Sequence, residues 1–267
     1  MRIQPLAFAL IQMGLLLRPV AAQAEEAPRV VHVLVALCDN EHQGIVKVGK
    51  AIGNGQDPAN NLYWGAKYGV KNHFKTSADW TLLQTEKNPR EHVLERLVFR
   101  HASRNVRIVA EAYDGQFISD TVWDFLCASA GRLQADVSVK GPDGTVSIVH
   151  AGGASDLIVY IGHNGLMDFS FKEYPKQADD RQRNVIILAC AARSYFDKPL
   201  HEAGAYPVVW TTNLMAPEAY TLRDALDGWV SGEENDRVRE RAAAAYHQYQ
   251  KCGLKAARRL LVTGFEE

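Results

Sequence analysis

Two apolar, β-branched runs near the middle of the chain constrain its fold more than any other feature. The first, residues 157–161, continues through Gly162 to His163, and the second, residues 185–189, continues directly into Cys190. Runs of this kind are typical of strands buried on both faces of a parallel sheet. In open α/β sheets, ligands and reacting groups gather beyond the carboxyl ends of the strands. The sequence therefore predicts a site at one sheet edge that contains an imidazole and a thiol.

Strand-like and helix-like segments alternate around these runs. Further strands are expected over residues 29–38, 80–84 and 206–212, and antiparallel hairpins over 93–113 and 136–149. This order predicts an α/β fold, a three-layer sandwich with a mostly parallel sheet flanked by helices and antiparallel hairpin additions. Because no linker or internal repeat is evident, residues 25–267 are expected to form a single domain. The expected helices cover residues 61–74, 119–131, 217–230, 234–251 and 254–261.

The amino terminus has the order of a secretory signal peptide. Arg2 precedes an apolar stretch over residues 6–17, and small residues around Ala24 form a cleavage site before an acidic pair. The apolar stretch is too short to span a membrane, and no later segment approaches that length. We therefore expect residues 1–24 to be removed and the mature chain to be exported, periplasmic or secreted, without a membrane span.

The charge pattern bears on nucleic-acid binding, and the cysteine content bears on disulfides. The formal net charge is −1 at pH 7, and no cluster of Lys and Arg is interleaved with aromatic residues, which argues against nucleic-acid binding. An oxidising compartment favours disulfides among the four cysteines. Since Cys38 and Cys190 end strand-like runs, we expect any disulfide to join Cys127 and Cys252, which lie in helix-like segments.

The thiol and the imidazole can act together as a nucleophile and an acid/base. A neighbouring imidazole can hold a thiol as thiolate near neutral pH. If the two runs form adjacent strands, the side chains of His163 and Cys190 emerge roughly 5 Å apart. A crossover of about 20 residues suits neighbouring parallel strands. The backbone N–H groups of Gly165 and Cys190 are the candidate oxyanion donors.

With these residues in this order, the chain resembles the caspase, legumain, gingipain and separase superfamily of cysteine peptidases. There an apolar strand ends at the catalytic His-Gly, and a later apolar strand ends at the catalytic Cys, often as Ala-Cys. The matching residues here are His163-Asn164-Gly165 and Ala189-Cys190. The resemblance implies a caspase-like α/β sandwich, His163 as acid/base, Cys190 as nucleophile and a peptide or protein as substrate. No cofactor or metal is expected.

The walls of the cleft are expected to come from loops at the same sheet edge. The loop over residues 39–61 is long and rich in Asn, Gly and Asp, and long loops inside a compact domain are usually functional. Asp39 or Asn40 could orient the imidazole, and Asp168 with Glu173 could favour a basic substrate side chain. For Trp210, core packing is an alternative to a cleft role. The expected cleft residues are Asp39, Asn40, His42, Asp168, Trp210 and Asn213.

Three interpretations of this site stay open. The favoured one is an exported thiol hydrolase that cleaves peptide bonds. The second is the same fold retained without catalysis, as a binding or assembly module. The third is a zinc site in which Cys38, Asp39 and His42 join His163 and Cys190, although no closely spaced ligand pair such as C-x-x-C supports it.

Overall fold

The computed structural model describes residues 27–141 and 143–265. The predicted leader, residues 1–24, lies outside the described residues. The strands are β1 (Arg29–Ala36), β2 (Trp80–Arg90), β3 (Val93–His101), β4 (Val106–Tyr113), β5 (Gln134–Lys140), β6 (Val146–Gly152), β7 (Leu157–Ile161), β8 (Asn184–Leu188), β9 (Tyr206–Thr211) and β10 (Leu261–Val262). The helices are α1 (Val70–Lys75), α2 (Ile118–Ser129), α3 (Ala192–Ala203), α4 (Ala219–Val230), α5 (Asn235–Gln250) and α6 (Leu254–Leu260), with short 3-10 turns at Gly115–Phe117 and Gly165–Met167.

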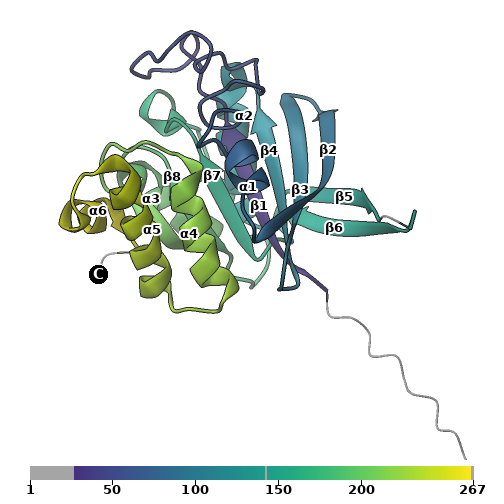
Figure 1. Cartoon of the computed structure of the whole chain (residues 1–267). Coiled ribbons are helices and arrows are strands. Elements are labelled where there is room, and N and C mark those ends of the chain that lie inside the picture. Colours follow the sequence, from purple (N-terminus) through teal and green to yellow (C-terminus); the bar gives the residue numbers. More distant parts are fainter. Residues whose placement is uncertain (1–26, 142, 266–267) are drawn as a thin grey trace, which may run out of the picture.

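An eight-stranded mixed sheet organises the fold, in the order β10-β9-β8-β7-β1-β4-β3-β2 (Figure 1). Its central strands β4, β1, β7, β8 and β9 are parallel, whereas β2, β3 and β10 pair antiparallel to their neighbours. The strands β5 and β6 form a separate two-stranded antiparallel sheet. The α/β class, the mainly parallel sheet and both hairpins predicted from the sequence are confirmed.

Side-chain alternation along β1 divides the core between the two faces of the sheet. Val31, Val33 and Val35 belong to the core beneath α1, α4 and α5, and Leu34 and Ala36 belong to the core beneath α2 and α3. Figure 1 shows α4 and α5 side by side over one face. Because β1 is buried on both faces, its sequence is a near-continuous apolar run, as a central parallel strand requires.

The β5–β6 hairpin covers part of the sheet near β3 and β4. Val137 and Val149 of the hairpin pack against Val98 and Val109 of the sheet. The outer side of the hairpin leaves Ile148 55% exposed. The hairpin therefore buries one face and presents the other to solvent.

The two strands that carry the His and the Cys are adjacent, as predicted. β7 and β8 run parallel from the pair Leu157 and Asn184 to the pair Ile161 and Leu188. The chain continues for two residues beyond the last pair on each strand and reaches His163 and Cys190. The register therefore places both residues at the same level, just beyond the carboxyl ends of β7 and β8.

Two local predictions are wrong. The segment over residues 61–74 is helical only from Val70, because the side chain of Asn61 instead bonds the end of β1: its Oδ1 accepts from the Cys38 N–H at 3.1 Å and its Nδ2 donates to the Cys38 carbonyl at 2.8 Å. Asn side chains that bond the backbone in this way compete with helix formation. All four cysteines are free. Cys127 in α2 and Cys252 after α5 belong to elements on opposite faces of the sheet, so they do not form the expected disulfide.

No helix within residues 27–141 and 143–265 is long and apolar enough to cross a membrane.

A buried carboxylate on β4 links this strand to β1, β2 and β3 and, through Arg90, to helix α2. Glu111 is fully buried; its Oε1 accepts from Arg96 Nε at 2.8 Å, and its Oε2 accepts from Arg90 Nη2 at 2.9 Å and lies 3.2 Å from His32 Nε2. Arg90 also donates to Asp124 of α2 at 2.9 Å. Burial by itself would raise the pKa of Glu111, but the hydrogen bond from His32 and the nearby positive charges hold it well below its usual range.

Replacing this carboxylate should destabilise the fold strongly. Glu111→Gln leaves two guanidinium groups without a buried counter-charge, and we expect the free energy of unfolding to fall by about 3–5 kcal/mol at pH 7. Because the pKa of Glu111 is depressed in the folded state, its stabilisation is present above the unfolded Glu pKa, about 4.3, and is lost as the pH falls below it. Urea unfolding at pH 7 and at pH 4, followed by tryptophan fluorescence, measures both effects.

Glu86→Gln is the matched control, because Glu86 pairs with the same Arg96 at 3.0 Å but is 42% exposed. A surface pair of this kind contributes about 0–1 kcal/mol. Equal costs for the two substitutions, or a Glu111→Gln variant whose stability falls with pH as steeply as the wild type, would contradict the role assigned to Glu111.

Candidate active site

The imidazole of His163 is held by a carboxylate just downstream in the chain. Its Nε2 lies 2.7 Å from Oδ2 of Asp168, and only 7% of the imidazole side chain is exposed. The carbonyl of His163 accepts from the hydroxyl of Tyr160 at 2.6 Å, which fixes the backbone at this point. The contact with Asp168 therefore occupies Nε2 of His163, and Nδ1 remains available to another partner.

The same carboxylate reaches the loop over residues 39–61. Oδ2 of Asp168 also accepts from the backbone N–H of Gly44 at 3.2 Å. A Cβ on Gly44 would lie only 2.6 Å from Oδ1 of Asp168, so the approach is close. Asp168 thus joins the loop to the imidazole.

Cys190 lies in the sharp turn between β8 and α3. The next residue, Ala191, has a left-handed φ of 48°, a conformation that costs a non-glycine residue roughly 1–2 kcal/mol. The turn is held to the end of β9, since the N–H of Ala191 donates to the Asn213 carbonyl at 2.9 Å and the N–H of Ala192 donates to Thr211 Oγ1 at 3.0 Å. The strained turn leaves Cys190 partly exposed.

The sulfur of Cys190 is bonded to the backbone of Met215. The Met215 N–H donates to Sγ at 3.4 Å, and the thiol can donate to the Met215 carbonyl at 3.6 Å. The N–H of Cys190 itself donates to no other described residue. That N–H is therefore free to bond an oxygen of a bound molecule.

Asn164 ties the two strand ends together. It is fully buried, its Nδ2 donates to the Cys190 carbonyl at 2.7 Å, and its Oδ1 accepts from the Leu166 N–H at 3.2 Å. Asn164, the residue between His163 and Gly165, therefore links the ends of β7 and β8.

His163 and Cys190 line one cavity, of about 290 Å³, which we call the Cys190 cavity. Its volume is close to the lower end of the roughly 300–1,000 Å³ of small-molecule pockets, so it suits part of a larger molecule. Beyond these two residues, the cavity is lined by Gly44, Ile45, Val46, Val48, Tyr63, Gly162, Met167, Leu214, Met215 and Pro217.

The structure places several expected cleft residues elsewhere. Asp39 bonds Nδ1 of His42 at 2.8 Å rather than the imidazole of His163. Asn40 bonds both backbone groups of Val48 at 2.9 Å. These side chains shape the loop that contributes Gly44, Ile45, Val46 and Val48 to the cavity, but they do not line it themselves.

The Asp39 and His42 pair is an ion pair within that loop. Burial would raise the pKa of Asp39, but hydrogen bonds from Gln56, from the Glu41 backbone and from His42 together lower it. The hydrogen bond to Asp39 raises the pKa of His42. The charge of each partner therefore stabilises the other.

Trp210, Asn213 and Gly165 also lie outside the Cys190 cavity. Trp210 is fully buried in the core beneath α2 and α3, where its Nε1 donates to the Gly264 carbonyl at 3.1 Å, as in the core-packing alternative. Asn213 supports the Cys190 turn through its backbone. Gly165 packs under the ring of Phe169, so of the two expected oxyanion donors only Cys190 lines the cavity.

The residues required for the zinc interpretation do not gather. Within the described ranges, no group of three or more His, Cys, Asp and Glu side chains could hold a metal ion. Cys38 is buried, and this burial raises the pKa of its thiol to about 11.

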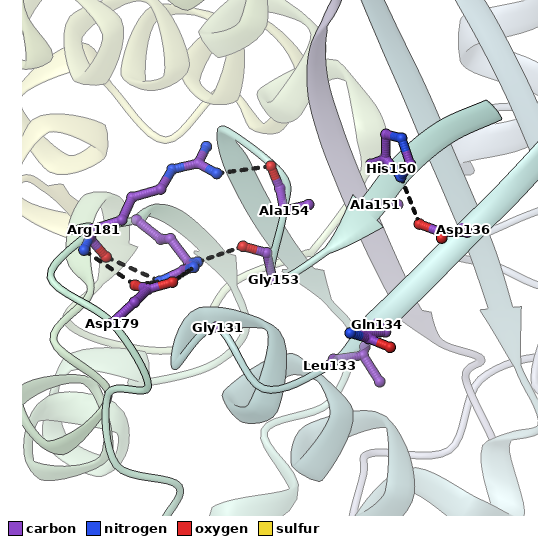
Figure 2. Close-up of a pocket in the computed structure, with 11 residues that line it drawn as sticks. Gly131, Leu133, Gln134, Asp136, His150, Ala151, Gly153, Ala154, Asp179 and Arg181 are labelled. Atoms are coloured by element: carbon purple, nitrogen blue, oxygen red, sulfur yellow. Dashed lines mark hydrogen bonds and ion pairs between the residues drawn. The ribbon is translucent and has the colours of Figure 1, made fainter. Parts of the chain in front are cut away.

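A second hollow lies at the opposite edge of the sheet, near the amino ends of β7 and β8 (Figure 2). Its charged side chains are paired: Arg183 bonds Asp179 at 2.7 Å, and His150 bonds Asp136 at 2.8 Å. Arg181 donates to the Ala154 carbonyl at 2.9 Å. No thiol lines this hollow, so the carboxyl edge of the sheet carries the candidate chemistry.

Sequence reasoning missed several contributors to the site, among them Met215, Tyr63 and the contact of Asp168 with the imidazole. Met215 lies four residues beyond β9, and its backbone bonds the thiol. Tyr63 belongs to the segment expected to be a core helix, yet it lines the cavity. The rule that sites form at the carboxyl ends of strands could have pointed to the segment after β9, but nothing in the sequence of residues 61–69 shows where Tyr63 lies.

No protein-family model, curated protein or solved structure matches this chain.

Proposed function

We propose that this protein is a caspase-like cysteine-type hydrolase that cleaves peptide bonds, with Cys190 as nucleophile and His163 as acid/base. The observation that carries the proposal is the equivalent placement of the two residues, each two residues beyond the paired ends of adjacent parallel strands and both lining one cavity. The carboxylate that holds the imidazole supports it further.

The proposed reaction needs only groups at this site and one water molecule. His163 takes the thiol proton as the sulfur of Cys190 attacks the substrate carbonyl carbon, and the N–H of Cys190 donates to the oxyanion that forms. His163 gives a proton to the leaving amine as the C–N bond breaks and a thioester remains. Water then attacks the thioester, His163 takes its proton, and the acid leaves as the sulfur regains a proton.

Two dipoles have their positive ends near the sulfur. Cys190 lies two residues before α3, a 12-residue helix whose amino terminus is the positive end of the helix dipole. The Met215 N–H donates to the sulfur at 3.4 Å. An attacking thiolate would benefit from both.

The proposal includes a specific fold, the caspase-like three-layer sandwich. Helices pack on both faces of a mainly parallel sheet, which supports a caspase-like three-layer sandwich over residues 25–267. The sequence of residues 1–24 supports export to the periplasm or the medium. A peptide or protein is the proposed substrate.

One observation favours the second candidate, a binding or assembly module without catalysis. Within the described chain, the hydrogen bonds of the Cys190 sulfur run to Met215, and none joins it to His163. A thiol that stays bonded to the backbone would be part of a binding cavity only. The reactivity of Cys190 separates the two candidates.

Cys190 should be the most reactive of three thiols compared in one experiment. Burial raises the pKa of Cys38 and of Cys127 to about 11, so both are poor nucleophiles at pH 7. In a Cys252→Ser background, which removes the exposed thiol, we expect iodoacetamide to label Cys190 at least about tenfold faster than the other two. Peptide mass spectrometry over time gives the three rates.

His163→Ala should slow the labelling of Cys190 by about tenfold or more, because the imidazole no longer takes the thiol proton. His42→Ala is the matched control, since His42 also bonds a carboxylate but does not line the cavity. If Cys190 is labelled as slowly as Cys38, or equally fast in both histidine variants, the hydrolase proposal fails and the binding module stands.

Asp168 is expected to act as a positioning residue for the imidazole. With a fluorogenic peptide substrate, Asp168→Asn should lower kcat by about 10- to 100-fold, a part of the 10²–10⁴-fold that general acid–base catalysis supplies. KM should stay nearly unchanged, because the carboxylate bonds His163 and Gly44 rather than the substrate.

Asp168→Glu should recover part of kcat, and Glu173→Gln, which changes an exposed carboxylate five residues away, should leave it unaltered. A rise in KM without a fall in kcat would place Asp168 in substrate binding instead.

A further inference from the structure

We infer that the substrate residue bound beside Cys190 carries an uncharged, apolar side chain. This inference rests on the proposed function, because it takes the Cys190 cavity as the place where the acyl part of the substrate binds. The evidence comes from the lining of the cavity, from its rim and from the state of the charged groups around it.

The lining of the Cys190 cavity is apolar apart from the two reacting residues. Ile45, Val48, Met215 and Pro217 contribute hydrocarbon and thioether groups. Tyr63 also lines the cavity and is only 8% exposed. Among the residues that the structure describes, no Lys, Arg, Asp or Glu lines the cavity.

The rim of the cavity exposes large apolar side chains from three separate loops. Val46 is 91% exposed, Leu214 is 68% exposed and Met167 is 40% exposed. They follow β1, β9 and β7 in turn, so they converge on the cavity from different parts of the chain. Clustered exposed apolar groups mark binding sites, because covering them removes apolar surface from water.

The acidic groups near the cavity already have partners. Asp168 accepts from His163 and from the Gly44 N–H, and Asp39 bonds His42 and Gln56. The sequence-based expectation that Asp168 favours a basic substrate side chain stays a prediction: Oδ2 of Asp168 is engaged by His163 and Gly44, and Asp168 does not line the Cys190 cavity. A charged substrate side chain would enter an apolar cavity without a partner, and burying an unpaired charge is costly.

The inference can be tested by the covalent labelling of Cys190 with three peptidyl chloromethyl ketones, Ac-Ala-Ala-X-CH₂Cl, in which X is Leu, Lys or Asp. The sulfur displaces chloride from the methylene carbon, a C–S bond forms, and the thiol proton passes to the buffer. Each rate is divided by the iodoacetamide rate of the same protein. This ratio removes differences in thiol reactivity and leaves the contribution of the side chain X.

We expect the Leu probe to label Cys190 at least tenfold faster than the Lys or Asp probe after this normalisation. Leu214→Asp should raise the relative rate of the Lys probe by tenfold or more, because it puts an unpaired carboxylate at the rim. Ile148→Asp is the matched control: Ile148 is also exposed, by 55%, but it lies on the β5–β6 hairpin, and its substitution should change no ratio.

Equal normalised rates for the three probes, or a preference for Lys or Asp, would overturn the inference. Failure of the proposed function has a different signature. If the Leu preference is present but Ac-Ala-Ala-Leu-aminomethylcoumarin is not hydrolysed, the cavity binds apolar side chains without catalysis. If that substrate is hydrolysed but its Lys and Asp counterparts are hydrolysed as fast, the enzyme stands and the apolar preference does not.

Discussion

Ile161 of β7 is paired with Leu188 of β8, and the whole candidate site depends on this register. Side chains alternate along a strand, so a slip of one residue would turn either the imidazole or the thiol to the opposite face of the sheet. Asn164 opposes such a slip, because its amide bonds the carbonyl of Cys190 across the strand ends. The short apolar strands and one buried amide together set the geometry from which all proposed chemistry follows.

The loop over residues 39–61, which forms part of the cavity wall, is held near both of its ends. At its start, Asn40 bonds the backbone of Val48. Beyond its end, the indole of Trp64 donates to the fully buried carboxylate of Glu95 at 2.6 Å, and Lys71 bonds the same carboxylate at 2.9 Å. A segment with little regular structure is thereby fixed to β3, which explains how a loop can present side chains to a reacting centre at defined positions.

The strands, the mainly parallel sheet and the adjacency of the strand before His163 to the strand before Cys190 could be predicted, because long apolar runs and their carboxyl ends leave few alternatives. Loop conformation could not. From the sequence, Asp39 or Asn40 is expected to orient the imidazole and Asp168 to contact the substrate, but in the fold Asp168 bonds His163 and Asp39 is engaged by His42. Trp210 ends a strand, as a cleft residue would, but its side chain points into the core. Such outcomes depend on long-range contacts that residue spacing does not encode.

The bond between Gly44 and Asp168 ties variation in the loop to the orientation of the histidine. Any side chain at position 44 would meet a carboxylate oxygen at 2.6 Å, and a carboxylate at the end of a short side chain relieves such crowding by rotating away. In doing so it would release His163. Exposed positions of this loop can therefore accept new residues, but at Gly44 even a methyl group would disturb the contact between Asp168 and the imidazole. Sequence variation in this part of the cavity wall is confined to the residues around Gly44.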